Sequence, residues 1–239
     1  TGLSLATATG AITGTAPAVS ADTTTTFSIT ATDDENQTSS SRSFSITVTN
    51  DGPSNHFNTV LYTGNDVSHA ITGVGFQPDF VWIKRRSSNE DHALYDIIRG
   101  INKQLSSNTN TVEATNTAPY EGFTSFDADG FTVNNNGATN RAPNTYVAWS
   151  FKAGGAAVSN TDGTTTSQVS VNNTLGFSIV NYTAQGGTSV GHGLNGAPDL
   201  IILKGVDTAE TWQVYNSASG TGKYMELNAN AAEVSRANS

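Results

Sequence analysis

Alternation of apolar and polar residues with a two-residue period is the clearest pattern along this chain. It is strongest at residues 25–32 and 42–49, where apolar side chains take every second position. Since successive side chains of a β-strand point to opposite faces, each segment has one apolar and one polar face. No window of about ten residues shows the 3.6-residue period of an amphipathic helix. The pattern therefore predicts an all-β protein.

Further strands are predicted where similar runs are bounded by Gly, Pro, Asn or Asp. They are expected at residues 3–5, 11–15, 58–63, 80–84, 124–126, 131–133 and 145–152. In the last of these, Val147, Trp149 and Phe151 share a face, which we interpret as the face that packs in the core. Residues 127–130 have the composition of a hairpin loop.

One sequence pattern occurs twice, 120 residues apart. Phe57, Val60, Tyr62, Pro78, Asp79, Lys84, Tyr95, Gly100, Lys103 and Asn108 recur in register as Phe177, Val180, Tyr182, Pro198, Asp199, Lys204, Tyr215, Gly220, Lys223 and Asn228. Repetition at a domain-sized period is typical of tandem modules. The second copy reaches Ser239, before the counterparts of the 126–131 hairpin and the 146–151 strand, so we expect the natural chain to continue or other strands to complete the sheets.

The expected architecture is a series of tandem β-sandwich modules, jelly-roll-like or immunoglobulin-like. The boundaries follow from turn-rich stretches and from the repeat. We predict a partial immunoglobulin-like module at 1–50, a linker at 51–55, a first sandwich repeat at 56–155, a linker or connecting loop at 156–174, and an incomplete second repeat at 175–239.

The N-terminal strands resemble the C-terminal half of a bacterial immunoglobulin-like or cadherin-like module. The resemblance is carried by Gly2–Leu5, Thr9–Thr15, Phe27–Asp33 and Phe44–Thr49. The early strands of that module are absent here. Because half a sandwich cannot bury its own core, we expect partner strands from upstream residues or from another chain.

The rest of the chain looks like a repeat domain without assigned chemistry in structural proteins of tailed phages, particularly marine ones. The matching segments are 57–65, 71–84, 125–131 and 144–155. The resemblance implies a virion component, such as a tail fibre, tail appendage or head decoration, that presents loops for host attachment. The expected protein is not an enzyme, is located in the virion, and has other copies of itself and other virion proteins as partners, with a host-surface glycan or protein as ligand.

Two alternatives remain open at this stage. A secreted bacterial adhesin could be built from the same modules, and a polysaccharide-degrading tailspike would be a catalytic relative of a fibre. Asp79 and Asp199 invite the second reading, because glycoside hydrolysis uses two carboxyl groups that face one bond. Each follows a Pro at equivalent places of the two copies, however, and we interpret both as parts of a repeated turn.

Net charge and composition exclude some classes of binding partner and of covalent or metal site. The 239 residues carry a formal net charge of −9, and only 13% of them are charged. An acidic protein repels nucleic acid and anionic membranes, so we expect no nucleic-acid partner and no membrane insertion. With no Cys, disulfides and thiolate metal sites are excluded.

The sequence shows no catalytic or metal-binding motif among its four His residues, His56, His69, His92 and His192. We expect no cofactor other than Ca²⁺, which prefers several hard oxygen ligands. The candidates are Asp33, Asp34, Glu35 and Asp51, near the module junction where cadherin-like modules bind Ca²⁺. A second acidic pair, Asp127 and Asp129, is interpreted as an ordinary turn.

Aromatic residues are the remaining candidates for ligand binding, because their faces pack against the apolar faces of sugars. Trp82 and Trp149 lie in runs with core-like neighbours, so we expect them in the core. Trp212 aligns with His92 in the other copy and is the candidate for an exposed ligand surface.

Overall fold

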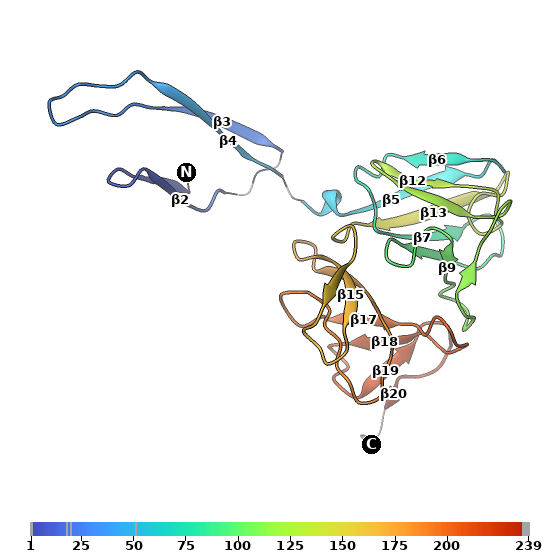
Figure 1. The fold of residues 1–239 in the computed structure, drawn as a ribbon. Helices are drawn as coiled ribbons and strands as arrows, with labels where there is room; N and C mark the ends of the chain where they lie inside the picture. The colour runs from blue at the N-terminus through green and yellow to red at the C-terminus, as the bar shows by residue number, and fades with distance from the viewer. Residues whose placement is uncertain (1, 18, 20, 51, 236–239) are drawn as a thin grey trace. The chain divides into compact units, whose positions relative to one another are not determined.

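The computed structural model describes residues 2–17, 19, 21–50 and 52–235. The chain divides into two compact units, Thr1–Gly52 and Pro53–Ser239. Almost all regular structure in both units is antiparallel β-strand (Figure 1), which confirms the predicted all-β class. The described residues contain no helix with the length and apolar character needed to cross a membrane.

The first unit consists of two separate hairpins. Its strands are β1 (Leu3–Ala6), β2 (Ala11–Gly14), β3 (Thr23–Ile29) and β4 (Arg42–Val48). β1 pairs with β2, and β3 pairs with β4 from Thr23↔Val48 to Ile29↔Arg42. Most side chains of these strands are exposed, although the rings of Phe27 and Phe44 stack across β3 and β4 with centroids 5.9 Å apart. The unit therefore has hairpin pairing without an enclosed core among its described residues.

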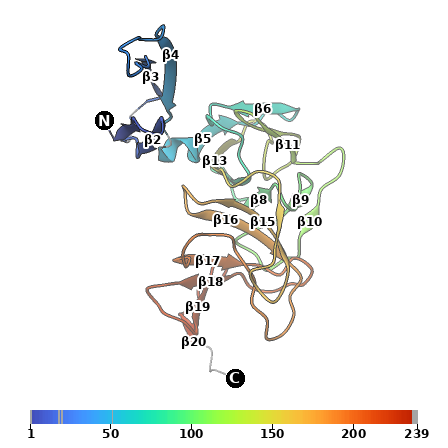
Figure 2. The same cartoon turned by 60° about the vertical axis from the view of Figure 1, so that its left-hand side comes forward.

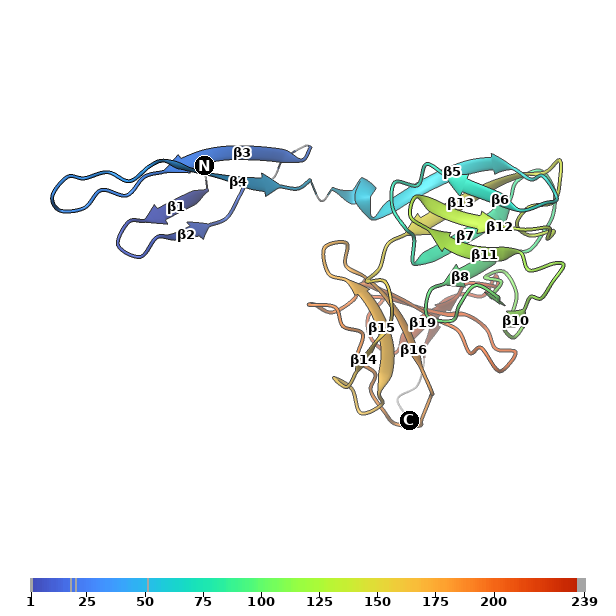
Figure 3. The same ribbon diagram turned by 45° about the horizontal axis from the view of Figure 1, so that its top comes forward.

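The second unit begins with a complete sandwich, which we call the first module (residues 56–155). A short 3-10 helix, η1 (Pro53–Asn55), leads into it. Its strands are β5 (Phe57–Thr63), β6 (His69–Thr72), β7 (Phe80–Arg85), β8 (Ala93–Asp96), β9 (Lys103–Gln104), β10 (Ala114–Thr115), β11 (Phe123–Asp127), β12 (Gly130–Val133) and β13 (Thr145–Phe151). The larger sheet has the order β5-β13-β7-β8 and the smaller one β11-β12-β6 (Figure 3).

The core of the first module lies between these two sheets. Side chains from β7, β8, β12 and β13 close it, including Val81, Ile83, Tyr95, Phe131, Val133, Tyr146 and Ala148. The buried face of β13 is therefore the face with Tyr146, Ala148 and Ser150. The prediction that Val147, Trp149 and Phe151 form the core face is wrong, because the smaller sheet covers the other side of the strand.

Residues 156–235, which we call the second module, form two further sheets (Figure 2). One has the order β14-β15-β16 and the other β17-β18-β19-β20. The strands are β14 (Val158–Asn160), β15 (Ser167–Asn172), β16 (Phe177–Tyr182), β17 (Leu200–Leu203), β18 (Gln213–Asn216), β19 (Lys223–Glu226) and β20 (Val234–Ser235). The stretch predicted as a linker or loop at 156–174 thus contains two strands.

Five strands of the second module lie at the positions of first-module strands shifted by 120 residues. β16 corresponds to β5, and β17, β18, β19 and β20 correspond to β7, β8, β9 and β10. Side-chain contacts follow the same shift. The N–H of His92 donates to Asn108 Oδ1 at 2.9 Å, and the N–H of Trp212 donates to Asn228 Oδ1 at 2.8 Å. Similar local sequence therefore gives similar local structure in both modules.

Candidate ligand-binding cleft

The two modules are joined by a buried contact around Trp212. Its side chain is only 5% exposed and packs with Leu94 and Leu105 of the first module. The indole Nε1–H donates to the carbonyl oxygens of Ser106 (3.0 Å) and Thr109 (3.1 Å). A buried indole that satisfies its N–H in this way fixes one module on the other.

A second contact between the modules is a cluster of phenyl rings. The ring of Phe151, at the end of β13, lies 4.7 Å from that of Phe57 and 5.2 Å from that of Phe177. Phe80 adds a fourth ring, 5.7 Å from Phe151. Phe57 and Phe177 are equivalent residues of the two sequence copies, and both of their rings contact Phe151.

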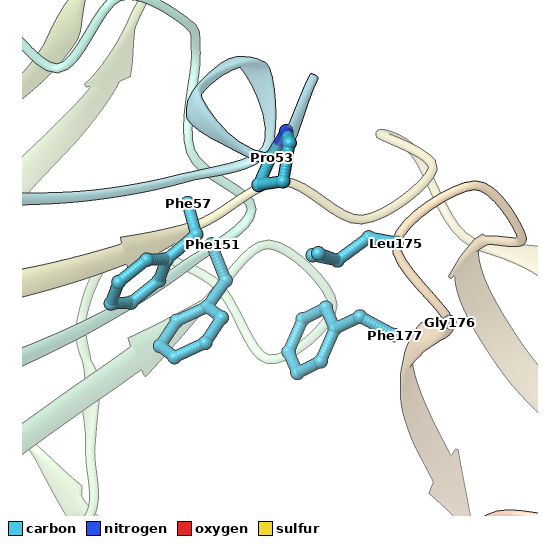
Figure 4. Close-up of a pocket in the computed structure, with 6 residues that line it drawn as sticks. All are labelled: Pro53, Phe57, Phe151, Leu175, Gly176 and Phe177. Atoms are coloured by element: carbon cyan, nitrogen blue, oxygen red, sulfur yellow. The ribbon is translucent and has the colours of Figure 1, made fainter. Parts of the chain in front are cut away.

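This cluster borders an open apolar cleft of about 450 Å³. The cleft is lined by Pro53, Phe57, Phe151, Leu175, Gly176 and Phe177 (Figure 4). In the close-up, the three phenyl rings lie together below Pro53, and Leu175 faces them from the β15–β16 turn. Phe57 remains 38% exposed, so its ring is accessible from the cleft.

Polar groups beside the cleft hold its walls together. His56 Nδ1 lies 2.8 Å from Asn172 Nδ2, which also donates to the carbonyl of Lys152 at 3.2 Å. The Asp79 carboxylate accepts from the N–H groups of Ala153 (2.8 Å) and Gly155 (3.1 Å). Burial raises the pKa of Asp79 above its ordinary value, while the hydrogen bonds from Gly155 and Ala153 act in the opposite direction. These contacts fix the segment that connects the modules.

The cleft suits binding more than proton transfer. Its walls are carbon surface from aromatic, Pro and Leu side chains, which favour a flat apolar ring, the apolar face of a sugar, or an apolar side chain of a partner. No sequence pattern pointed directly to this cleft. The recurrence of Phe57 as Phe177 was visible, but their meeting at Phe151 depends on how the modules pack.

The prediction that Trp212 forms an exposed ligand surface is wrong. Trp212 is buried between the modules, so its ring is not available as an exposed platform. Trp82 and Trp149 are half-buried on the outer face of the larger sheet, with their rings edge to face at 6.2 Å. Trp82 also donates to His92 Nδ1 at 2.7 Å, and burial lowers the pKa of His92. These aromatic residues therefore serve packing within the second unit.

The calcium candidates that the structure describes make no metal site. Asp33, Asp34 and Glu35 lie in the β3–β4 loop, where Asp33 Oδ1 accepts from the N–H of Gln37 at 2.7 Å as a turn contact. Asp51 lies outside the described residues. Within the described part of the chain, no group of three or more His, Asp or Glu side chains is placed to hold a metal ion.

The other acidic candidates have structural contacts. Asp129 accepts from the N–H groups of Gly75 (2.6 Å) and Gly73 (3.1 Å), and these hydrogen bonds lower its pKa. Asp79 is buried, whereas Asp199 is exposed and accepts from the Ser217 hydroxyl at 2.7 Å. The two Asp residues thus hold separate turns of different modules.

Family models match both parts of the chain. The model described as "Domain of unknown function (DUF7483)" matches residues 52–239, and the model described as "Putative Ig domain" (He_PIG) matches residues 1–49. No curated protein and no solved structure matches the chain. The first match covers both modules, and the second covers the two N-terminal hairpins.

Proposed function

We propose, from the premise that the chain belongs to the DUF7483 family, that it is a non-enzymatic structural component of a tailed-phage virion. The observation that carries the proposal is the packing of two similar β-modules through Trp212 and the phenyl cluster. Fixed module-to-module contacts suit a fibre, tail appendage or head decoration, because such parts must hold binding loops away from the particle. The sequence resemblance to a domain of phage structural proteins supports the same role.

In this role the chain contributes to attachment by presenting weak binding sites in many copies. The cleft at Phe57 offers an accessible aromatic wall for a host-surface glycan or protein. Many copies on one particle multiply such weak contacts into strong attachment. The partners are then other copies of the chain, other virion proteins and the host surface, and the location is the virion.

Immunogold electron microscopy of purified particles tests the proposal, with an antibody raised against residues 56–155. Label at the tail tip or fibres supports host attachment, and label over the head supports decoration. Unlabelled particles together with a labelled bacterial surface would overturn the virion role. That result would favour a secreted adhesin, the second candidate, which the immunoglobulin-like match at residues 1–49 also suits.

A binding assay on host cells tests the cleft itself. Phe57→Ala removes an exposed cleft wall and is expected to weaken binding of the isolated chain. Leu61→Ala is the matched control, because Leu61 is 64% exposed on the same strand and does not line the cleft. Equal binding by both variants and the unmodified chain would remove the cleft from the proposed attachment surface.

A further inference from the structure

The sequence contains two Asn-Gly pairs, one in each module, at residues 136–137 and 195–196. An Asn that precedes Gly loses its side-chain amide more readily than other Asn residues, because Gly has no Cβ to hinder its own backbone nitrogen. The reaction also requires the Asn side chain to turn toward that nitrogen. A folded chain can therefore protect one pair and leave another reactive.

The pair in the first module is held in place. Asn136 Oδ1 accepts from the N–H of Ala138 at 2.9 Å, and its Nδ2 donates to the carbonyl oxygen of Tyr120 at 3.1 Å. The backbone carbonyl of Asn136 also accepts from the N–H groups of Thr139 (3.2 Å) and Asn140 (2.9 Å). Both residues of the pair are half-buried. Because rotation of this side chain would break its hydrogen bonds, the structure protects Asn136.

The pair in the second module lies exposed in the β16–β17 loop. The backbone N–H of Asn195 donates to Asn173 Oδ1 at 2.8 Å, and Asn173 Nδ2 donates to the carbonyl of Gly193 at 3.3 Å. These contacts anchor the chain just before the pair. The Asn195 side chain itself makes no hydrogen bond with another described residue. The side chain is therefore free to turn toward the nitrogen of Gly196.

The surroundings of Gly196 are also open. A Cβ added there would have no atom within 4 Å apart from the neighbouring residues, and the φ angle of Gly196 lies outside the left-handed region. The attacking nitrogen is thus unobstructed. The same observation means that Ala can replace Gly196 without a clash or backbone strain, which provides a clean variant for a test.

We propose that Asn195 is a site of spontaneous deamidation in the folded chain. The backbone nitrogen of Gly196 attacks Cγ of Asn195, which forms a new N–Cγ bond and a cyclic imide. The Cγ–Nδ2 bond breaks, and the amide leaves as ammonia with the proton from Gly196. Water then opens the ring at either carbonyl and gives aspartate or isoaspartate. Each product adds one negative charge to a chain whose formal net charge is −9.

The position of the new charge connects the modification to the cleft. Asn173, which holds the loop before Asn195, lies in the β15–β16 turn, and the same turn provides Leu175 to the cleft wall. Deamidation would therefore change the charge of a loop that is tied to one wall of the cleft. The proposal rests on the two Asn-Gly pairs and is independent of the virion role.

Peptide mapping by mass spectrometry tests the proposal on the full chain, incubated at mildly alkaline pH and sampled over time. The measured quantity is the fraction of aspartate plus isoaspartate at positions 136 and 195. We expect Asn195 to convert at least about tenfold faster than Asn136, because Asn136 must first break two side-chain hydrogen bonds. In urea-unfolded chain the two positions should convert at similar rates, since both then have the same neighbour.

Two variants test the route of the reaction. Gly196→Ala places a Cβ beside the attacking nitrogen and is expected to slow conversion of Asn195 by at least about tenfold. Ala197→Ser is the matched control, because it changes the next exposed residue and leaves the pair intact. It should convert like the unmodified chain. The comparison of Asn195 with Asn136 in the unmodified chain does not depend on either variant.

Three results would overturn the proposal. One is an Asn195 that stays intact in the folded chain while it converts in the unfolded chain, because the fold would then protect it. Another is an equal rate at Asn136 and Asn195 in the folded chain, which would show that the surroundings have no effect. The third is an unchanged rate in Gly196→Ala, which would exclude attack by the backbone nitrogen.

Discussion

The two modules of the second unit share a sequence pattern but differ in how completely their strands are covered. In the first module, β13 lies between β5 and β7, and Ile83 is 0% exposed. In the second module, β16 and β17 belong to separate sheets, and Leu203 at the equivalent position is 41% exposed. Since turns and hairpins are alike in both, the comparison shows that local sequence sets local pairing. Closure of a core depends on a strand from far along the chain.

The largest expected effect comes from breaking the contact that holds the two modules together. Trp212→Ala removes a buried indole and its hydrogen bonds to Ser106 and Thr109, so we expect the free energy of unfolding to fall by about 3–5 kcal/mol. His92→Ala is the matched change in the first module, where the loss of one acceptor for Trp82 should cost about 1 kcal/mol. Urea unfolding followed by tryptophan fluorescence and circular dichroism measures both. Similar losses in the two variants would show that the module contact contributes little.

The second test compares two equivalent positions of the modules, one buried in the core and the other exposed. Ile83→Ala empties a fully buried site between the two sheets and is expected to cost about 2–5 kcal/mol. Leu203→Ala changes an exposed side chain, and the expected cost is less than about 1 kcal/mol. Urea unfolding again gives the two values. An equal cost at both positions would contradict the difference in closure between the modules.

A third test uses an ion pair that occurs in both modules. In the first module, Glu113 forms ion pairs with Lys103 at 3.3 Å and with the largely buried Arg99 at 3.1 Å. In the second module, Glu233 forms an ion pair with Lys223 at 2.8 Å, and it has no other ion pair among the described residues. Glu113→Gln is therefore expected to cost about 1–3 kcal/mol, as for a hydrogen bond to a charged group. Glu233→Gln changes an ion pair at the surface and should cost less than Glu113→Gln, and still less in high salt, because water and ions screen exposed charges. Thermal unfolding at two salt concentrations separates the two cases, and a larger loss for Glu233→Gln would contradict the expected ranking.

The smallest effect is a pair of opposite pH dependences within the first module. The folded state raises the pKa of Asp79, so it favours the protonated carboxyl. This contribution to stability is fully present below pH of about 4 and is lost as the pH rises through the raised pKa. The folded state lowers the pKa of Asp129, so it favours the ionised carboxylate. This contribution to stability is fully present above pH of about 4 and is lost as the pH falls through the lowered pKa.

Unfolding of Asp79→Asn and Asp129→Asn between pH 2.5 and 7 measures these dependences. The stability of the unmodified chain relative to Asp79→Asn should decrease as the pH rises, and its stability relative to Asp129→Asn should increase. Slopes of the same sign would show that hydrogen bonds from Ala153 and Gly155 outweigh the burial of Asp79.

The pattern of apolar and polar residues predicted the positions of the long strands well, but it did not predict which face of each strand is buried. The segments 80–84 and 145–152 closely match β7 and β13, because each is an apolar-rich run that is long enough to be recognised alone. The pattern shows that β13 has two different faces. It does not show which face the smaller sheet will cover, and here the larger Trp149 and Phe151 lie on the outer face.

The missed elements depend on partners that are distant in sequence. The stretch 156–174 is rich in Gly, Ser, Thr and Asn, which predicts a linker or connecting loop. β15 lies within it, and its sequence, SQVSVN, has only two apolar residues. It is a strand because it pairs along its whole length with β16. The cleft was missed for the same reason, since Phe57 and Phe177 meet only when the modules pack at Phe151. Trp212 was expected at a surface because its burial depends on Ser106 and Thr109 of the other module.

The pairing of β5 with β13 also bears on how the first module would respond to tension. The chain enters this sandwich at Phe57 and leaves it at Phe151, and these two residues lie opposite each other at the same end of the pair. A pull on the two ends of the module would therefore load the interstrand hydrogen bonds one after another, as in unzipping, and not all at once in shear. The phenyl stack at that end would be the first contact to carry the force, so stretching would open the module from its aromatic cleft.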